Sequence, residues 1–522
     1  MLNLGEVGLR EMALAVATNG MRDAGYTNFN LDDGWAGQRL ANGSITAAPA
    51  GFPSGTLAPL AAYVTSLGLQ LGTYTDRGTS TCAGRTGSKG FEAMDVATYI
   101  DWGISYVKVD SCNSAQDFPS TLRDYRAFAA PLAAAGVFFS VCGWSDWLAG
   151  ASPQLGSSWR INQDASFWTR FLENLKSAAA VANLTGPGRG WPDVDMISGR
   201  WSAAQEVAHL SAIAVIGSPL LLSFDPRTAN ASTLGLQAYL NPELIAIHQD
   251  APLAGAPYYA RVAGADAQGE NATRLLAVNC SAPEAVWTYT PVSANANTNA
   301  PGFGTLAAAG SGMCLGLWDL FPGKCVNAVY AGTVPCGTGG ALGCPHSAQL
   351  WALGNASNGW ALATALNYSG GTPLYPGAML TSTAVPGSYY VQPQGAAAAG
   401  GGTQSWAHTL APGVAGQTVL RGADGRCLAP AASGAFNVWA RWLACGDVAL
   451  LLINFGAVPA AVTCNAACMA SLPRQGVLPP TAWAARDIWA RAAAGTLLPS
   501  GYVSPMLPAD GGSLLLRLTP VA

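Results

Sequence analysis

The sequence predicts an α/β protein with a (β/α)8 TIM barrel, followed by an all-β insertion and a C-terminal antiparallel β-sandwich. Three observations support this fold class. Helix-like and strand-like segments alternate over about the first 250 residues, which is typical of a parallel sheet closed into a barrel. Polar residues follow the strand ends, where the catalytic residues of such barrels collect. From about residue 255, small and polar residues dominate and short apolar runs replace the helical ones.

The barrel elements can be assigned in order along the chain. The first helix is expected at residues 5–20, because Leu9, Met12 and Val16 have helical spacing and Gly20 is a stop signal. Strands are expected where short apolar runs follow such helical segments. The remaining pattern is strand 26–32, helix 57–66, strand 69–75, helix 91–102, strand 104–110, helix 120–134, strand 137–142, strand 159–161, helix 166–181, loop 186–196, helix 201–215, strand 219–224 and helix 232–247.

Changes in composition divide the chain into four parts. The apolar runs at 449–454 and 513–518 predict two strands of the C-terminal sandwich. The expected parts are the barrel at 1–250, a connector with the first sandwich strand at 251–285, a β-rich insertion at 286–432 and the sandwich at 433–522.

The composition argues against several classes of function. The net charge is −4 and no basic block occurs, so the chain has no nucleic-acid-binding signature. No apolar run reaches the roughly 18–20 residues that a membrane span needs. The 4 histidines are scattered, which argues against a His-based metal site or a Ser-His-Asp triad. We therefore expect chemistry that rests on carboxylates, with no metal and no cofactor. The sequence does not predict an oligomeric state.

Cysteines and glycosylation sequons indicate the secretory pathway, in an extracellular, cell-wall, vacuolar or lysosomal protein. The chain has 12 cysteines, many for a cytosolic enzyme. The N-terminal segment lacks the charged and apolar regions of a signal peptide. If the segment ending at Asp193 and Asp195 is counted as a strand, only seven of the eight barrel strands can be assigned. We therefore expect a chain truncated upstream of residue 1, without its signal peptide and first barrel strand. The Asn-x-Ser/Thr sequons begin at Asn42, Asn183, Asn230, Asn271, Asn279, Asn355 and Asn367.

Polar side chains at the strand ends carry the strongest chemical signal. Lys108 and Asp110 end one strand, two residues apart, so they lie on the same face. Burying either charge alone is costly, so the pair must face a polar cavity or a partner. A purely structural ion pair is the alternative. A barrel brings all strand ends to one rim, so distant carboxylates converge there. The other polar residues at these ends are Asp32, Asp33, Tyr74, Asp76, Cys142, Trp144, Arg160, Asp164, Asp193 and Asp195.

A series of ordered motifs runs through the barrel and the C-terminal region. They are Asp32-Asp33-Gly34-Trp35, Leu71-Gly72-Thr73-Tyr74, Lys108-Val109-Asp110, Trp159-Arg160 with Asp164, Trp191 with Asp193 and Asp195, Gly217-Ser218-Pro219-Leu220, Arg486-Asp487-Ile488-Trp489 and Gly512-Ser513-Leu514-Leu515. With these motifs the chain resembles the glycoside hydrolase family of α-galactosidases and α-N-acetylgalactosaminidases, the melibiases. The resemblance covers residues 5–251 and 439–522.

The resemblance implies a retaining exo-glycosidase that removes terminal α-galactosyl groups from oligosaccharides or glycoconjugates. It makes Asp110 the nucleophile and Asp164 the general acid/base. In such enzymes the two carboxyl groups lie about 5–5.5 Å apart. Lys108 would keep Asp110 anionic, and a less solvated Asp164 would hold its proton. The resemblance also implies a Cys82–Cys112 disulfide and a substrate-binding set of Asp32, Asp33, Tyr74, Lys108, Cys142, Trp144, Arg160 and Asp195.

Departures from the family pattern leave the substrate open. The family's first strand, Gly-Trp-Asn-Ser-Trp, has no counterpart before Gly5, and Gly143 stands where the family has Glu. Asp32 and Asp33 favour galactose, because the pair can bind a 6-hydroxyl. A β-L-arabinopyranosidase is the close alternative, and the space at Gly143 also suits α-N-acetylgalactosamine. A different class is a non-catalytic carbohydrate-binding protein, which would result if the barrel without its first strand is inactive.

The insertion contains two Gln-x-Trp triplets, Gln349-Leu350-Trp351 and Gln404-Ser405-Trp406, each with a Cys-Leu pair nearby. These elements resemble ricin-type β-trefoil carbohydrate-binding repeats. The alternative is a disulfide-pinned β insertion with buried tryptophans and no sugar site. The sequence leaves both interpretations open.

Overall fold

The structure of the protein is a computed structural model. Its described part divides into two compact units, one containing the barrel and the sandwich and the other made of residues 116–119 and 269–434. The described residues are 5–115, 118–143, 155–162, 164–252, 258–262, 275–278, 280–281, 285–291, 303–308, 313–318, 330–335, 351–356, 359–364, 379–382, 389–392, 406–407, 415–422, 427–430, 437–456, 458–473 and 479–521.

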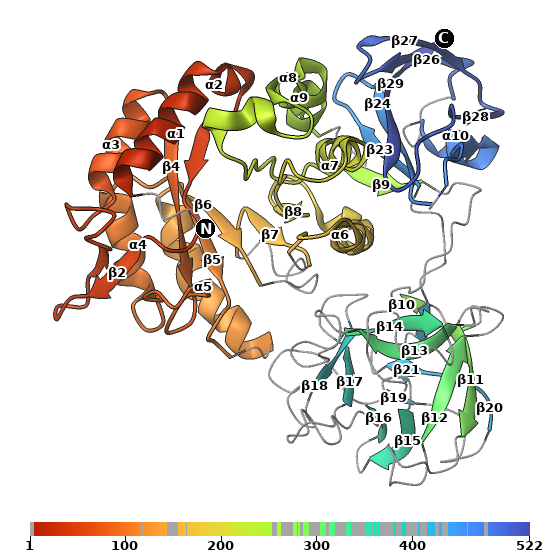
Figure 1. The fold of residues 1–522 in the computed structure, drawn as a ribbon. Helices are drawn as coiled ribbons and strands as arrows, with labels where there is room; N and C mark the ends of the chain where they lie inside the picture. The colour runs from red at the N-terminus through yellow and green to blue at the C-terminus, as the bar shows by residue number, and fades with distance from the viewer. Residues whose placement is uncertain are drawn as a thin grey trace. The chain divides into compact units, whose positions relative to one another are not determined.

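The barrel sheet has six parallel strands in the order β1-β4-β5-β6-β7-β8 (Figure 1). Its central strands are buried on both faces, which explains their nearly continuous apolar sequence. The strands are β1 (Asn28–Asn30), β4 (Gln70–Asp76), β5 (Tyr106–Asp110), β6 (Phe138–Val141), β7 (Ser158–Arg160) and β8 (Trp191–Asp193). A hairpin that the sequence analysis did not predict, β2 (Ala36–Arg39) with β3 (Ile45–Ala47), follows β1.

The prediction of a strand at 219–224 is wrong. The structure has only an isolated parallel bridge between Ile197 and Leu222 in this segment. The Ile197 N–H donates to the Leu221 carbonyl at 2.8 Å, and the Ser223 N–H donates to the Ile197 carbonyl at 2.9 Å. Pro219 has no N–H to extend the ladder. Among the described strands, β1 forms one edge of the sheet and β8 the other.

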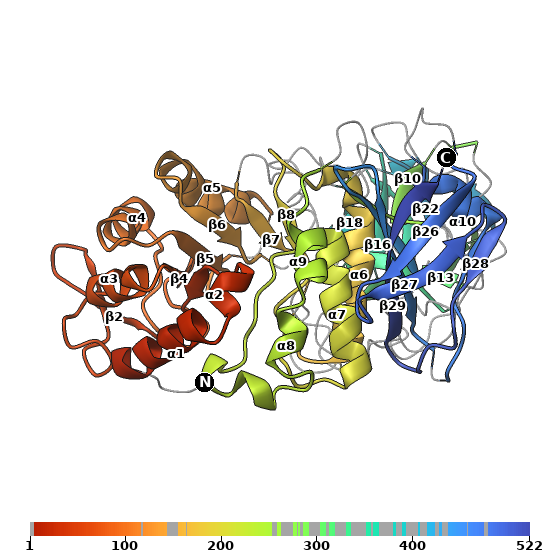
Figure 2. The ribbon, with the colours of Figure 1, turned by 90° about the horizontal axis from the view of Figure 1, so that it is seen from above.

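Helices surround this sheet. In Figure 2, α7 packs between α6 and α9. The helix expected at 232–247 is split into α8 and α9, because the Asn241 side chain caps a new helix that starts at Pro242. No helix in the described ranges is both long and apolar enough to cross a membrane. The helices are α1 (Glu6–Thr18), α2 (Met21–Ala24), α3 (Ala58–Ser66), α4 (Glu92–Asp101), α5 (Phe118–Ala134), α6 (Trp168–Ala180), η3 (Ala182–Leu184), α7 (Ala203–Ile216), η4 (Pro226–Ala231), α8 (Leu236–Tyr239) and α9 (Pro242–Gln249).

The C-terminal region forms a six-stranded antiparallel sheet in the order β27-β26-β29-β24-β23-β9, with a two-stranded sheet, β25-β28, and the helix α10. Arg441, which is fully buried, joins this region to the barrel because it donates to the carbonyls of Ala214 and Asp250 at 2.7 and 2.6 Å. The elements are β9 (Tyr259–Arg261), β23 (Val438–Trp442), β24 (Val448–Asn454), β25 (Thr463–Asn465), α10 (Ala466–Ser471), β26 (Ala482–Asp487), β27 (Ala492–Leu497), β28 (Gly501–Val503) and β29 (Gly512–Val521).

In the second unit, the described elements of residues 269–434 are strands, which form a nine-stranded and a four-stranded sheet, and a disulfide joins Cys280 to Cys427. Trp287 is buried and donates to the Leu428 carbonyl, so this tryptophan belongs to the core. Gln349 and Gln404 lie outside the described residues, so sugar binding by the insertion stays a prediction. The strands are β10 (Leu275–Val278), β11 (Val286–Pro291), β12 (Phe303–Ala308), β13 (Met313–Trp318), β14 (Tyr330–Pro335), β15 (Trp351–Ala356), β16 (Gly359–Thr364), β17 (Met379–Ser382), β18 (Tyr389–Gln392), β19 (Trp406–Ala407), β20 (Gly416–Val419), β21 (Arg421–Gly422) and β22 (Cys427–Pro430).

Candidate active site

Two neighbouring strands bring Asp110 together with the side chains that surround it. β4 and β5 pair in parallel, so that Tyr74 lies opposite Lys108 and Asp76 lies opposite Asp110. Residues two apart on a strand point to the same face, so these four side chains lie on one side of the sheet. All four are at the carboxyl ends of their strands, where active sites form in this fold.

The Asp110 carboxylate is buried and oriented. Its side chain is only 6% exposed. The Tyr74 hydroxyl donates to Oδ2 at 3.0 Å, and the Ser111 N–H donates to Oδ1 at 2.8 Å. Burial raises the pKa of Asp110, while the charge of Lys108 and these two hydrogen bonds act in the opposite direction. A fixed carboxylate of this kind suits a nucleophile.

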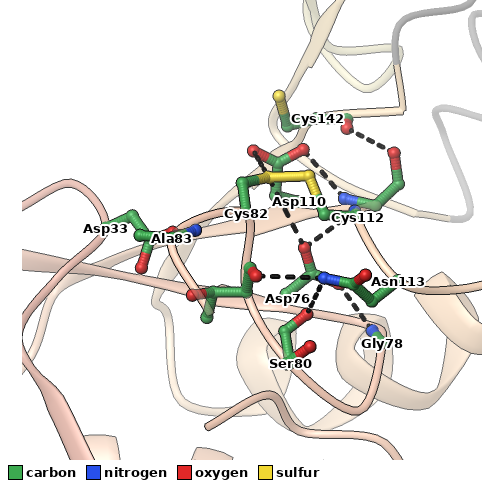
Figure 3. Close-up of a disulfide and its surroundings, with 12 residues drawn as sticks. Asp33, Asp76, Gly78, Ser80, Cys82, Ala83, Asp110, Cys112, Asn113 and Cys142 are labelled. Carbon is green, nitrogen blue, oxygen red and sulfur yellow. Dashed lines mark hydrogen bonds between the residues drawn. A yellow bond between two sulfur atoms is a disulfide. The ribbon is translucent and has the colours of Figure 1, made fainter. Parts of the chain in front are cut away.

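Lys108 forms its salt bridge with Asp32, whose Oδ2 accepts from Nζ at 2.9 Å. Burial acts to lower the pKa of Lys108, but nearby charges, including Asp32 and Asp110, raise it well above its ordinary value. Lys108 is therefore an ammonium ion. Burial acts to raise the pKa of Asp32, yet the Lys108 ammonium lowers it. The neighbouring Asp33 accepts from the Ala83 N–H at 2.7 Å, a pair of residues that Figure 3 labels.

Arg160 links the candidate acid/base to a second carboxylate. It ends β7, is 3% exposed, and its Nη2 lies 3.1 Å from Asp164 Oδ1 and 3.0 Å from Asp195 Oδ2. Asp195 also accepts from the Ala165 N–H at 2.6 Å. The backbone of Asp195 is left-handed, with φ of 85°, a conformation that costs about 1–3 kcal/mol in a residue other than glycine. Strain of this kind concentrates at functional sites.

The expectation that Asp164 is the less solvated carboxyl is wrong for this structure. The Asp164 side chain is 61% exposed, whereas Asp110 is 6% exposed. Asp164 lies in the loop after β7. Among the described residues, this side chain therefore lies open to solvent and not in the apolar surroundings that the expectation assumed.

The Cys82–Cys112 disulfide joins the loops after β4 and β5, with the two Cα atoms 5.2 Å apart (Figure 3). Cys82 Sγ lies 3.5 Å from Asp110 Oδ2, so the disulfide packs directly against the candidate nucleophile. Cys142, after β6, is a buried free thiol, and burial raises its pKa well above the ordinary value. Trp144 lies outside the described residues.

A cavity of about 1430 Å³ opens at this rim. Its lining includes Asp32, Lys108, Arg160 and Asp195, so it brings together sugar-binding candidates from four strand ends. The same cavity continues to α1 and the segment 217–224, beside the edge strand β1. Its volume exceeds the roughly 300–1,000 Å³ of a typical ligand pocket.

The side chains around the disulfide have the spacing of metal ligands. One donor atom from each of Asp76, Cys82, Asp110 and Cys112 lies within 4.8 Å of the others. Both sulfurs are joined in the disulfide and cannot act as thiolate ligands. The cluster is therefore a pair of carboxylates under a disulfide.

Two buried carboxyls at the strand ends of the barrel sheet were not assigned roles from the sequence. Asp76 is 0% and Asp193 is 2% exposed. Burial raises the pKa of Asp76 to about 7, and burial also raises the pKa of Asp193. Both stand at strand ends, but the sequence pattern does not show the register in which neighbouring strands pair. The register pairs Asp76 with Asp110 and Asp193 with Arg160.

Comparisons with known proteins agree with the order of the parts. Residues 4–250 match a family model described as alpha galactosidase A, and residues 433–517 match the alpha galactosidase C-terminal β-sandwich domain. The chain is similar to a probable α-galactosidase of Dictyostelium discoideum, with 40% identity over 257 residues. It is also similar to α-galactosidase A of Cellvibrio japonicus, with 38% identity over 271 residues. Each match covers 48% of this chain, and 65% and 64% of the relatives, so the chain spans slightly less than two thirds of either.

A solved structure shows the same fold. The α-galactosidase of Saccharomyces cerevisiae matches with a TM-score of 0.58 and 18% identity, covering 99% of this chain and 94% of that chain. The predicted class, a (β/α)8 barrel with a C-terminal β-sandwich, is thereby confirmed. With two family models in the expected order on this fold, the chain belongs to the α-galactosidase (melibiase) family of glycoside hydrolases.

Proposed function

We propose that this protein is a retaining exo-glycoside hydrolase that releases terminal α-D-galactosyl groups, with Asp110 as nucleophile and Asp164 as general acid/base. The observation that carries the proposal is the Asp110 carboxylate, which is buried at a barrel strand end and fixed by the Tyr74 hydroxyl and the Ser111 N–H. Relatives at 40% and 38% identity that are named α-galactosidases support the substrate class.

The reaction would proceed in two displacements. In the first, an Asp110 oxygen attacks the anomeric carbon while Asp164 protonates the departing glycosidic oxygen. In the second, Asp164 removes a proton from water, and this water releases the sugar from Asp110 with its configuration retained. Lys108 contributes a fixed positive charge near Asp110, and Arg160 holds Asp164 from one side. These groups can act without a metal or a cofactor.

Sugar recognition would rest on the charged residues at the cavity. Asp32 and Asp33 would accept hydrogen bonds from galactose hydroxyls, and Lys108 would donate to the same sugar; all three residues line the cavity. Cys142, Arg160, Tyr74 and Asp195 complete the proposed substrate-binding set together with Trp144. Turnover of nitrophenyl α-galactoside, β-L-arabinopyranoside and α-N-acetylgalactosaminide distinguishes the three sugars. We expect the galactoside to have the highest kcat/KM. Galactose binding without turnover of any of them would instead indicate a non-catalytic carbohydrate-binding protein.

The nucleophile assignment has its own test. Asp110→Asn should abolish turnover and keep galactose binding, because the side-chain shape is retained while the attacking anion is lost. Azide should rescue Asp110→Gly and give a glycosyl azide of inverted configuration. A product of unchanged configuration would contradict the role of Asp110. The matched control is Asp124→Asn, since Asp124 is also buried but pairs with Arg77 and Lys89.

We further propose that the protein is a glycosylated protein of the secretory pathway. Three disulfides in the described residues, Cys82–Cys112, Cys280–Cys427 and Cys464–Cys468, support an oxidising compartment. Two sequon asparagines, Asn42 and Asn230, are exposed and accessible for glycosylation. Mass shifts on deglycosylation of protein from a eukaryotic secretory host would test the proposal, and an unglycosylated product would contradict it.

A further inference from the structure

Asp76 and Asp110 form a buried carboxyl pair. They end adjacent strands opposite each other, and one oxygen of each lies within 4.8 Å of the other. Their side chains are 0% and 6% exposed. Two like charges this close and this well buried do not ionise independently, so the pair titrates as a unit. The mechanism above uses only Asp110.

Asp76 also anchors the chain on both sides of the disulfide (Figure 3). Its Oδ1 accepts from the Gly78 N–H at 2.6 Å, and its Oδ2 accepts from the Cys112 N–H at 2.8 Å. Cys112 follows Asp110 by two residues. Asp76 therefore fixes the backbone that positions the candidate nucleophile.

The surrounding charges distinguish the two carboxyls. Each accepts two hydrogen bonds, but Lys108 and Arg160 act on Asp110. The cation beside Asp76 is Arg77, and its guanidinium is directed to Asp124 and the Ala115 carbonyl. Burial raises the pKa of Asp76 to about 7. Among the residues that the structure describes, the titratable and charged groups that face the pair are Tyr74 and Arg77 from β4 and its loop, Lys108 from β5, Tyr125 from α5, Cys142 after β6 and Arg160 from β7.

We propose that Asp76 is a positioning residue for Asp110 and that it binds the first proton taken up by the pair, so that Asp110 stays ionised in mildly acidic solution. The inference rests on the proposed function only in calling Asp110 the nucleophile. A carboxyl that takes the proton in place of Asp110 preserves the attacking anion in an acidic compartment.

Infrared spectroscopy of the full chain tests where the proton lies. At about pH 5, the C=O stretching band of protonated carboxyl groups should be stronger in the parent than in Asp76→Asn, and this difference should titrate near pH 7. Asp110→Asn should keep the band but lower its midpoint by about one pH unit, because a like charge is removed. Asp447→Asn is the control, because Asp447 is also buried but pairs with Arg517 in the C-terminal sheet and not with a group that faces Asp76. This variant should leave the band unchanged.

Each outcome decides the inference. Loss of the band in Asp110→Asn with retention in Asp76→Asn would place the proton on Asp110 and overturn it. An unchanged band in both variants would show two ionised carboxylates and overturn it as well. If Asp76→Asn does not fold, Asp110→Asn still gives the decision, since it keeps both N–H contacts of Asp76.

An activity measurement tests the positioning role. Asp76→Asn should lower kcat about tenfold, because an amide cannot accept from both N–H groups. In the pH profile of kcat/KM, the acid limb of Asp76→Asn should lie within about half a pH unit of that of the parent, because the Asn side chain imitates a protonated Asp76. A shift of this limb by a full unit would contradict the proton assignment. The infrared result does not depend on turnover, so a parent without activity would refute the proposed function and leave this inference testable.

Discussion

Removing the Tyr74 hydroxyl should move the acid limb of the reaction to higher pH. Tyr74 is 2% exposed and donates to Asp110 Oδ2 at 3.0 Å. Burial and the nearby carboxylates raise the pKa of Tyr74 far above the assay range, so the hydroxyl is always a donor. A hydrogen bond to a charged group contributes about 1.5–3 kcal/mol, and one pH unit corresponds to about 1.4 kcal/mol. Tyr74→Phe should therefore raise the pKa of Asp110, and the acid limb of the pH–rate profile should move up by about one to two pH units.

The sign follows from which form the hydrogen bond stabilises. The hydroxyl favours ionised Asp110, so its loss favours the protonated form, and activity should disappear at a higher pH than in the parent. The measurement is kcat/KM for nitrophenyl α-galactoside across the acid range. Tyr125→Phe is the matched control, since the Tyr125 hydroxyl is buried and, among the described residues, has no hydrogen-bond partner. The reasoning is refuted if the limb stays in place or if Tyr125→Phe moves it equally.

Two further changes test the loops beside the site. Replacing both Cys82 and Cys112 with Ser should lower the free energy of unfolding by about 3–4 kcal/mol, which is the chain-entropy value for a loop of roughly 30 residues. The midpoint of thermal unfolding should fall accordingly. An unchanged midpoint would contradict this account. Gly78→Ala should destabilise the protein by about 1–3 kcal/mol and reduce kcat. The reason is that the new methyl group would overlap the Cys112 carbonyl oxygen and lie 2.6 Å from the Asn113 carbonyl oxygen. Gly51→Ala is the control, because its methyl group would make only ordinary contacts. An equal loss of stability in Gly51→Ala would show that the overlap is not the cause.

The sequence predicted the barrel strands well where apolar runs are continuous. The run around Val107 is buried on both faces, and this double burial produces the pattern that identifies a parallel strand. The 219–224 segment has a similar apolar run, but its single bridge shows that apolarity alone does not establish pairing. The split between α8 and α9 follows from Asn241-Pro242, a start signal within the helical pattern.

The sequence allowed us to predict which strand ends carry the polar residues of the site. It did not allow us to predict which of these side chains contact one another. Strand alternation places Lys108 and Asp110 on one face, but the partner of Lys108 is Asp32, from the loop of another strand. Only the register of β4 with β5 shows that Asp76 lies opposite Asp110. Register depends on how neighbouring strands pack, and no local pattern in the sequence encodes the distance between two strands.

The exposure of Asp164 makes its role as an acid dependent on bound sugar. In the free protein the Asp164 side chain is 61% exposed and lies 3.1 Å from Arg160. A sugar bound against Asp110 would cover this side chain and favour its neutral form by desolvation. The profile of kcat/KM reports the free enzyme, and that of kcat reports the complex. We therefore expect the alkaline limb of kcat to lie at higher pH than that of kcat/KM. If the two limbs coincide, bound substrate does not change the protonation of Asp164. The proton for the departing glycosidic oxygen would then need another source.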